Sequence, residues 1–124
     1  MSATSKTAII LFGHGARDPE WARPMQRIAE AVRHASPQAA VSLAFLEFMT
    51  PSLPEAAAAA LTAGAGHLIV VPVFLAQGGH VRRDVPRMLA EIEAAHPGVQ
   101  ITLREALGES QMVIDAMASA ILLP

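Results

Sequence analysis

The chain of 124 residues contains no cysteine. Disulfides, thiolate zinc sites, iron–sulfur clusters and cysteine nucleophiles are therefore excluded. Charged residues are also scarce, at 16% of the chain, against a usual share of ~25%. Hydrophobic residues make up 52%, which rules out intrinsic disorder. So few charges leave part of the surface apolar, which favours an interface with another chain.

The sequence also lacks a strong excess of either charge, because the formal net charge is −2. The chain thus lacks the strongly basic charge balance that binds nucleic acid, and nucleic acid is excluded as a partner. The start of the chain has no basic segment followed by an apolar stretch and a cleavage site. The apolar stretch at residues 8–12 is far shorter than the ~20 residues that span a bilayer. We expect one cytoplasmic domain, residues 1–124, without a membrane partner.

Short apolar runs alternate with segments whose apolar residues recur at helical spacing. The runs predict strands at 7–12, 41–47, 67–75 and 99–103, and the segments predict helices at 20–35, 55–63, 85–96 and 109–122. This alternation predicts an α/β fold, a single four-stranded parallel sheet with helices on both faces. The first and third runs are the most uniformly apolar, which is typical of central strands. Pro72 is expected near the end of the third strand.

Two histidines and a carboxylate follow the predicted strands. His14 lies between two glycines after the first strand, Glu47 ends the second, and His80 follows Gly78 and Gly79 after the third. The carboxyl ends of parallel strands meet at one edge of a sheet, where ligands bind. Imidazole and carboxylate suit a first-row divalent metal, and imidazole can also take a proton near neutral pH. Each residue taken alone also fits a solvated loop position.

Seven of the eight arginines follow the two histidines, four after His14 and three after His80. Arginine binds carboxylate or phosphate with a planar, two-pronged fork. We expect Arg17, Arg82 and Arg83 to lie near an anionic substrate, and the others to occupy exposed helix faces. The remaining histidines, His34, His67 and His96, are interpreted as structural or exposed.

Several nucleotide and phosphate motifs are absent. The only lysine is Lys6, so no Walker loop is present, and Asp18 stands where a dinucleotide fingerprint needs glycine. A phosphatase of the histidine type would carry arginine directly before its nucleophile, whereas Gly13 precedes His14. Phosphotransfer through His14 remains a minor alternative.

Two segments resemble the signatures of the class II chelatases. They are residues 11–19 (LFGHGARDP) and residues 71–86 (VPVFLAQGGHVRRDVP), and residues 45–47 and 51–56 also fit. The resemblance is closest to the CbiX and SirB group, which inserts cobalt or iron into sirohydrochlorin. It covers nearly the whole chain in order. One departure is Ala16, where serine is common in the motif.

The resemblance implies a lyase of the short sirohydrochlorin cobaltochelatase type, acting in tetrapyrrole biosynthesis without ATP or any nucleotide. Its substrates would be sirohydrochlorin and a divalent metal, Co²⁺ first, with Fe²⁺ or Ni²⁺ as alternatives. His14 would be metal ligand and proton acceptor, and His80 and Glu47 would be further metal ligands. The residues implied to line the tetrapyrrole pocket are Phe12, Arg17, Leu75, Ala76, Gln77, Gly78, Gly79, Arg82 and Arg83.

The short chain corresponds to one half of longer family members. The resemblance therefore implies a homodimer with the site in the cleft between subunits. A carrier that binds metal or tetrapyrrole without turnover would use the same histidines, and the sequence leaves that alternative open.

Overall fold

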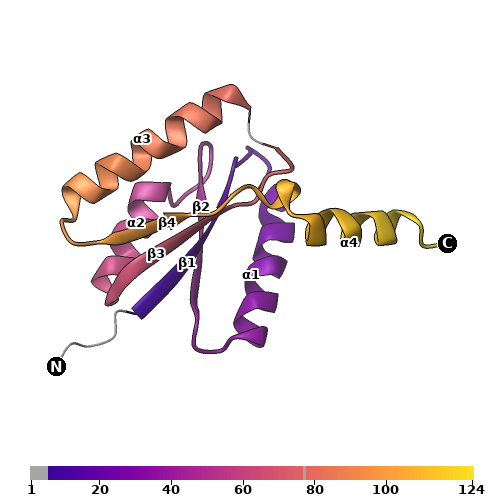
Figure 1. Cartoon of the computed structure of the whole chain (residues 1–124), viewed down its shortest axis with the longest axis horizontal. Coiled ribbons are helices and arrows are strands. Elements are labelled where there is room, and N and C mark those ends of the chain that lie inside the picture. The colour runs from indigo at the N-terminus through magenta and orange to yellow at the C-terminus, as the bar shows by residue number, and fades with distance from the viewer. Residues whose placement is uncertain (1–5, 77) are drawn as a thin grey trace.

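The computed structural model describes residues 6–76 and 78–124, apart from the side chain of His80. Within these residues, four parallel strands form one sheet in the order β2-β1-β3-β4 (Figure 1). The strands are β1 (Lys6–Gly13), β2 (Ala40–Phe45), β3 (Ala65–Pro72) and β4 (Gln100–Leu103). The predicted parallel sheet, with the first and third strands at its centre, is confirmed. β3 begins two residues before the predicted strand and stops short of its predicted end at residue 75. Pro72, which cannot donate to the ladder, is its last residue, and its expected place near the end of the strand is confirmed.

Helices lie on both faces of the sheet, as predicted. They are η1 (Pro19–Ala22), α1 (Arg23–Ala35), α2 (Leu53–Thr62), α3 (Gly79–Ala95), η2 (Leu107–Glu109) and α4 (Gln111–Ile121). On one face, α1 packs Met25 and Ala29 against Leu11 and Phe45. On the other face, α2 and α3 cover a larger core that includes Ile10, Phe12, Leu53, Leu68, Val70 and Val85. α4 extends away from the sheet (Figure 1).

The start of α3 differs from the sequence prediction. The sequence predicted a helix from residue 85, but α3 begins at Gly79 and holds Pro86 in its interior. An interior proline costs roughly 3 kcal/mol. Val81, Val85, Leu89 and Ile92 all bury their side chains against the sheet, and this continuous apolar stripe outweighs that cost. His80 therefore lies in the first turn of a helix and not in a loop.

Two other predicted boundaries are also corrected. β2 ends at Phe45 rather than at Glu47, because the Phe45 amide donates to the Pro51 carbonyl oxygen at 2.9 Å as the chain turns back. The last segment is divided at Ser110 into η2 and α4. Glu47 is thus a loop residue.

A capping box begins α2. The Ser52 hydroxyl accepts from the Glu55 amide at 3.2 Å, and the Glu55 carboxylate accepts from the Ser52 amide at 2.8 Å. Both bonds satisfy amides that have no partner inside the helix. We expect Ser52→Ala to lower the free energy of unfolding by about 1 kcal/mol. Urea unfolding measures this loss, and Ser119→Ala on exposed α4 is the matched control. Equal stability of the two variants would contradict the expectation.

No helix in the described part of the chain is long and apolar enough to cross a membrane.

Candidate functional site

The loops after β1 and β2 are joined backbone to backbone. The Leu46 amide donates to the Gly13 carbonyl oxygen at 2.9 Å, and the Glu47 amide donates to the His14 carbonyl oxygen at 3.0 Å. Gly15 has a positive φ of 89°, and a Cβ at this position would overlap the Glu47 carbonyl oxygen. Only glycine allows both this backbone conformation and this close approach. Two of the three expected metal ligands, His14 and Glu47, therefore lie on adjoining loops.

The His14 ring lies against Phe74. Their ring centroids are 4.3 Å apart with an interplanar angle of 35°, and Phe74 in turn contacts Phe12 at 6.0 Å between centroids. Phe74 and Phe12 are buried, while His14 is only partly buried. Phe74 thus covers one face of the imidazole, and His14 keeps part of its surface accessible. The expectation that Phe12 lines the pocket is wrong, because its side chain is fully buried and packs against Phe74 in the core.

The loop after β3 runs beside the His14 loop. The Val73 amide donates to the Phe12 carbonyl oxygen at 2.8 Å. Leu75 follows the buried Phe74 with 71% of its surface exposed, and Ala76 is also exposed. Gly78 caps α3 and Gly79 begins it, both exposed. Gln77 and the side chain of His80 lie outside the described part of the structure.

The metal ligands expected from the sequence are only partly accounted for. Among the side chains that the structure describes, no group of three or more histidine or acidic residues could hold a metal ion. At the edge of the sheet where β1 and β2 end, the partly buried imidazole of His14 and the exposed carboxylate of Glu47 lie on neighbouring loops. The backbone of His80 belongs to the first turn of α3, at the same edge of the sheet.

An exposed aromatic residue was missed by the sequence analysis. Phe48 is 59% exposed and has a positive φ of 67°, a backbone conformation that is rare for a large side chain and is often found at functional sites. The Arg17 guanidinium lies 4.9 Å from the centroid of the Phe48 ring. The only signal in the sequence was an aromatic residue directly after Glu47, in a position interpreted as the end of a strand.

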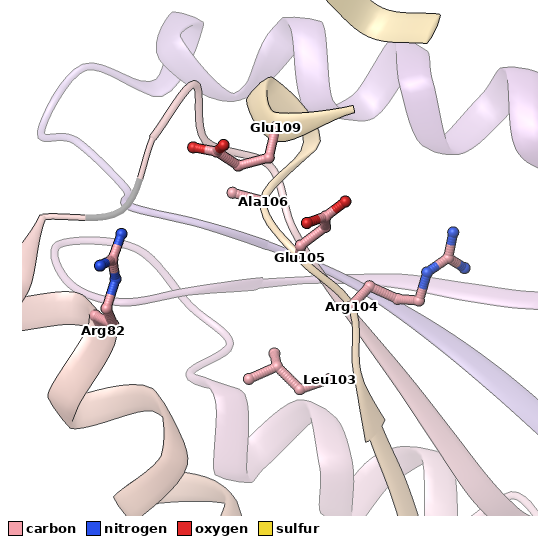
Figure 2. A pocket seen from close by; sticks show the side chains of 6 residues that line it. All are labelled: Arg82, Leu103, Arg104, Glu105, Ala106 and Glu109. Atoms are coloured by element: carbon pink, nitrogen blue, oxygen red, sulfur yellow. The ribbon is translucent and has the colours of Figure 1, made fainter. Parts of the chain in front are cut away.

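A hollow of about 450 Å³ lies between α3 and the segment after β4 (Figure 2). It is lined by Arg82, Leu103, Arg104, Glu105, Ala106 and Glu109. Glu109 extends toward the side of Arg82, whereas Arg104 points to the opposite side (Figure 2). The hollow therefore mixes both signs of charge. The other expected substrate residue on this helix, Arg83, is exposed.

His67 has the structural role that was expected. Its Nε2 atom lies 2.7 Å from the Thr102 hydroxyl oxygen, joining β3 to β4.

The sequence comparisons agree with one another. The CbiX family model matches residues 8–122. A sirohydrochlorin cobaltochelatase of Methanocaldococcus jannaschii is 42% identical over 89 residues, which is 72% of this chain and 62% of that protein. The chain thus spans less than two thirds of the length of that relative. A sirohydrochlorin cobaltochelatase of Methanococcus aeolicus is 29% identical over 87% of this chain and 92% of its own length.

Among solved structures, a CbiX protein and a sirohydrochlorin chelatase share this fold. A CbiX protein of Marinobacter aquaeolei VT8 superposes with a TM-score of 0.81 at 35% identity, covering 93% of both chains. The sirohydrochlorin chelatase SirB of Bacillus subtilis subspecies spizizenii, in complex with cobalt, has a TM-score of 0.80 at 25% identity. That match covers 94% of this chain but 50% of the SirB chain. One SirB chain is therefore about twice as long as the fold described above.

Proposed function

The chain belongs to the CbiX family, and from this membership we propose that it inserts a divalent metal ion into sirohydrochlorin. The observation that carries the proposal is the position of His14. Its ring is held against Phe74 and remains accessible, and its backbone is joined to that of Glu47. An imidazole held in this way can bind a metal ion and can also accept a proton.

His14 performs two steps in the proposed reaction. Its neutral ring first donates a lone pair to the metal ion, with the Glu47 carboxylate and the His80 imidazole as further ligands. As the metal passes to the tetrapyrrole nitrogens, two pyrrole N–H protons leave the ring; His14, freed from the metal, accepts one of them, and the other passes to water. A small and open set of ligands favours transfer, since a closed tetrahedral cage would retain the ion. No step needs a nucleotide.

The surroundings of His14 suit a ring with apolar faces and a carboxylate rim. Leu75 and Phe48 offer exposed apolar surface at this edge of the sheet, and such surface binds ring faces. Arg17, Arg82 and Arg83 offer cations for the carboxylates. Ala76, Gly78 and Gly79 have small or absent side chains, so the backbone of this loop can approach the ring closely. Gln77 is assigned to the same lining.

A second copy of the chain completes the site in this proposal. The SirB chain is about twice as long as this fold, and two copies of this chain would reach the same length. The substrate would then bind in the cleft between the two subunits.

Cobalt is the metal that the proposal favours. The relatives of Methanocaldococcus jannaschii and Methanococcus aeolicus are named cobaltochelatases, and SirB structures contain cobalt or Fe³⁺. Imidazole and carboxylate ligands distinguish poorly among first-row metals, so relative rates must decide. We expect anaerobic assays with sirohydrochlorin to rank Co²⁺ above Fe²⁺ and Ni²⁺, followed by the absorption spectrum against a protein-free control. A faster rate with Fe²⁺ or Ni²⁺ would overturn the assignment of cobalt.

Phe48→Ala is expected to weaken substrate binding without slowing the metal transfer. The exposed ring offers apolar contact, and its loss should raise the KM for sirohydrochlorin about tenfold, equivalent to ~1.4 kcal/mol. The kcat should change little, because Phe48 does not bind the metal. Steady-state kinetics separate the two constants, and Phe48→Tyr is the matched control that keeps the aromatic face. A lower kcat with unchanged KM would contradict this role.

A further inference from the structure

The imidazole of His14 contacts the described part of the chain through a stacked aromatic ring. Among the residues that the structure describes, no group hydrogen-bonds either nitrogen of this imidazole. The Phe74 ring lies against it, with the two centroids 4.3 Å apart and an interplanar angle of 35°. A histidine that binds a metal ion is usually oriented by a hydrogen bond on its second nitrogen. Here the stacked ring orients the imidazole and leaves both nitrogens available.

Phe74 is held through its side chain and through the backbone on both sides. Its side chain is 6% exposed and contacts Phe12 in the larger core, at 6.0 Å between ring centroids. On the β1 side, the Val73 amide donates to the Phe12 carbonyl oxygen at 2.8 Å. On the η2 side, the Gly108 amide donates to the Phe74 carbonyl oxygen at 2.9 Å. The ring that faces His14 is therefore fixed by close packing.

The contact between η2 and the loop after β3 requires glycine at position 108. A Cβ at Gly108 would overlap the Leu75 backbone, including its carbonyl oxygen. The segment before Gly108 is anchored, because Ala106 is buried in the larger core and the Arg104 amide donates to the Val70 carbonyl oxygen at 2.9 Å. A side chain at position 108 would therefore displace the loop that carries Phe74.

We propose that Phe74 and Gly108 are positioning residues for metal binding at His14. Gly108 holds the backbone of Phe74, and the Phe74 ring holds the imidazole in the orientation that binds the ion. Neither residue touches the metal. Functional side chains need rotamers that are locked by packing, and a misplacement of ~1 Å can slow a reaction about 100-fold. The inference rests on the proposed function and adds how its central ligand is oriented.

Phe74→Leu tests the stacked ring. Leucine keeps an apolar side chain in the core but removes the flat face, so the imidazole can turn. Calorimetric titration with Co²⁺ alone should show binding about tenfold weaker than that of the wild-type protein. The kcat of metal insertion should also fall about tenfold. The KM for sirohydrochlorin should change less than about twofold, because Phe74 is buried and offers little surface to the substrate.

Two controls separate orientation from a general loss of stability. Phe74→Tyr keeps the aromatic face and should bind Co²⁺ within about twofold of the wild-type affinity. Ile92→Ala destabilises the same core from α3 and should also keep that affinity. Wild-type affinity in Phe74→Leu would overturn the proposal. So would an equal loss in Phe74→Tyr or in Ile92→Ala.

Gly108→Ala tests the second step without changing a residue that contacts His14. The displaced loop should weaken Co²⁺ binding at least about fivefold. Gly98→Ala is the matched control, since a Cβ there would meet no atom within 4 Å, and it should leave the affinity unchanged. Equal affinities of the two variants would overturn the role of Gly108.

Co²⁺ binding and metal insertion are measured separately, so this inference and the proposed function can fail independently. A wild-type protein that binds Co²⁺ but inserts no metal would overturn the proposed function alone. A wild-type protein that binds no Co²⁺ would overturn both. Normal insertion by the wild-type protein, together with undiminished Co²⁺ affinity in Phe74→Leu and Gly108→Ala, would overturn only the positioning roles.

Discussion

Replacing His14 with alanine is expected to abolish metal insertion while the chain stays folded. The substitution removes both a metal ligand and the proton acceptor, and loss of a positioned acid–base group alone typically slows a reaction by 10²–10⁴-fold. The ring is only partly buried, and losing its contact with Phe74 should cost no more than ~1 kcal/mol. Insertion rates measure the catalytic loss, and thermal unfolding measures the structural one.

His34→Ala is the matched control for that experiment. His34 lies in the last turn of α1 and is exposed, so its removal deletes an imidazole without touching the loops after β1, β2 and β3. The control should keep the wild-type rate. Undiminished insertion by His14→Ala would overturn the proposed mechanism, and an equal loss in both variants would show that the effect is not specific to the site.

Gly15→Ala is expected to destabilise the fold by about 3–5 kcal/mol. A positive φ costs a residue with a Cβ ~1–2 kcal/mol, and the new Cβ would also overlap the Glu47 carbonyl oxygen. Relief of that overlap requires the His14 and Glu47 loops to separate, which breaks their hydrogen bond. At about 4 °C per kcal/mol, the Tm should fall by roughly 12 °C or more, and activity should fall with it.

Gly98→Ala isolates the contribution of the backbone conformation. Gly98 has a φ of 92°, close to that of Gly15, but a Cβ there would meet no atom within 4 Å. Its expected cost is therefore only ~1–2 kcal/mol. Calorimetry of both variants measures the difference. Similar losses of Tm would contradict the close packing of the two loops, because conformation alone would then explain both values.

The sheet could be predicted from the sequence because each strand is a distinct apolar run. The start of α3 could not be predicted, because it depends on the balance between the cost of a proline inside the helix and the gain from burying side chains against the sheet. Pro86 favours a helix that begins late, but Val81 gains burial against the sheet only if the helix begins earlier. That gain depends on a sheet surface formed by residues far away in sequence. Local signals such as proline and cap residues give no information about that surface.

The candidate site could be predicted from the sequence only in part. The rule that parallel strands end at one edge places His14 and Glu47 on neighbouring loops, and their hydrogen bond confirms this. The rule does not say which apolar residue at a strand end points inward. Phe12 faces the core and is buried, whereas Phe48 lies in a turn and is exposed. The exposure of α4 could likewise not be read from the sequence, because helical periodicity does not show whether a helix packs on the sheet.

The most direct test of the account counts metal insertions per chain. Purified wild-type protein is mixed anaerobically with a large excess of sirohydrochlorin and Co²⁺, and the absorption spectrum is followed against a protein-free control. The account predicts many metallated sirohydrochlorin molecules per protein chain, at a rate proportional to protein concentration. Metallation that stops at one molecule per chain or fewer, or that runs no faster than the control, would contradict an enzyme and indicate a carrier.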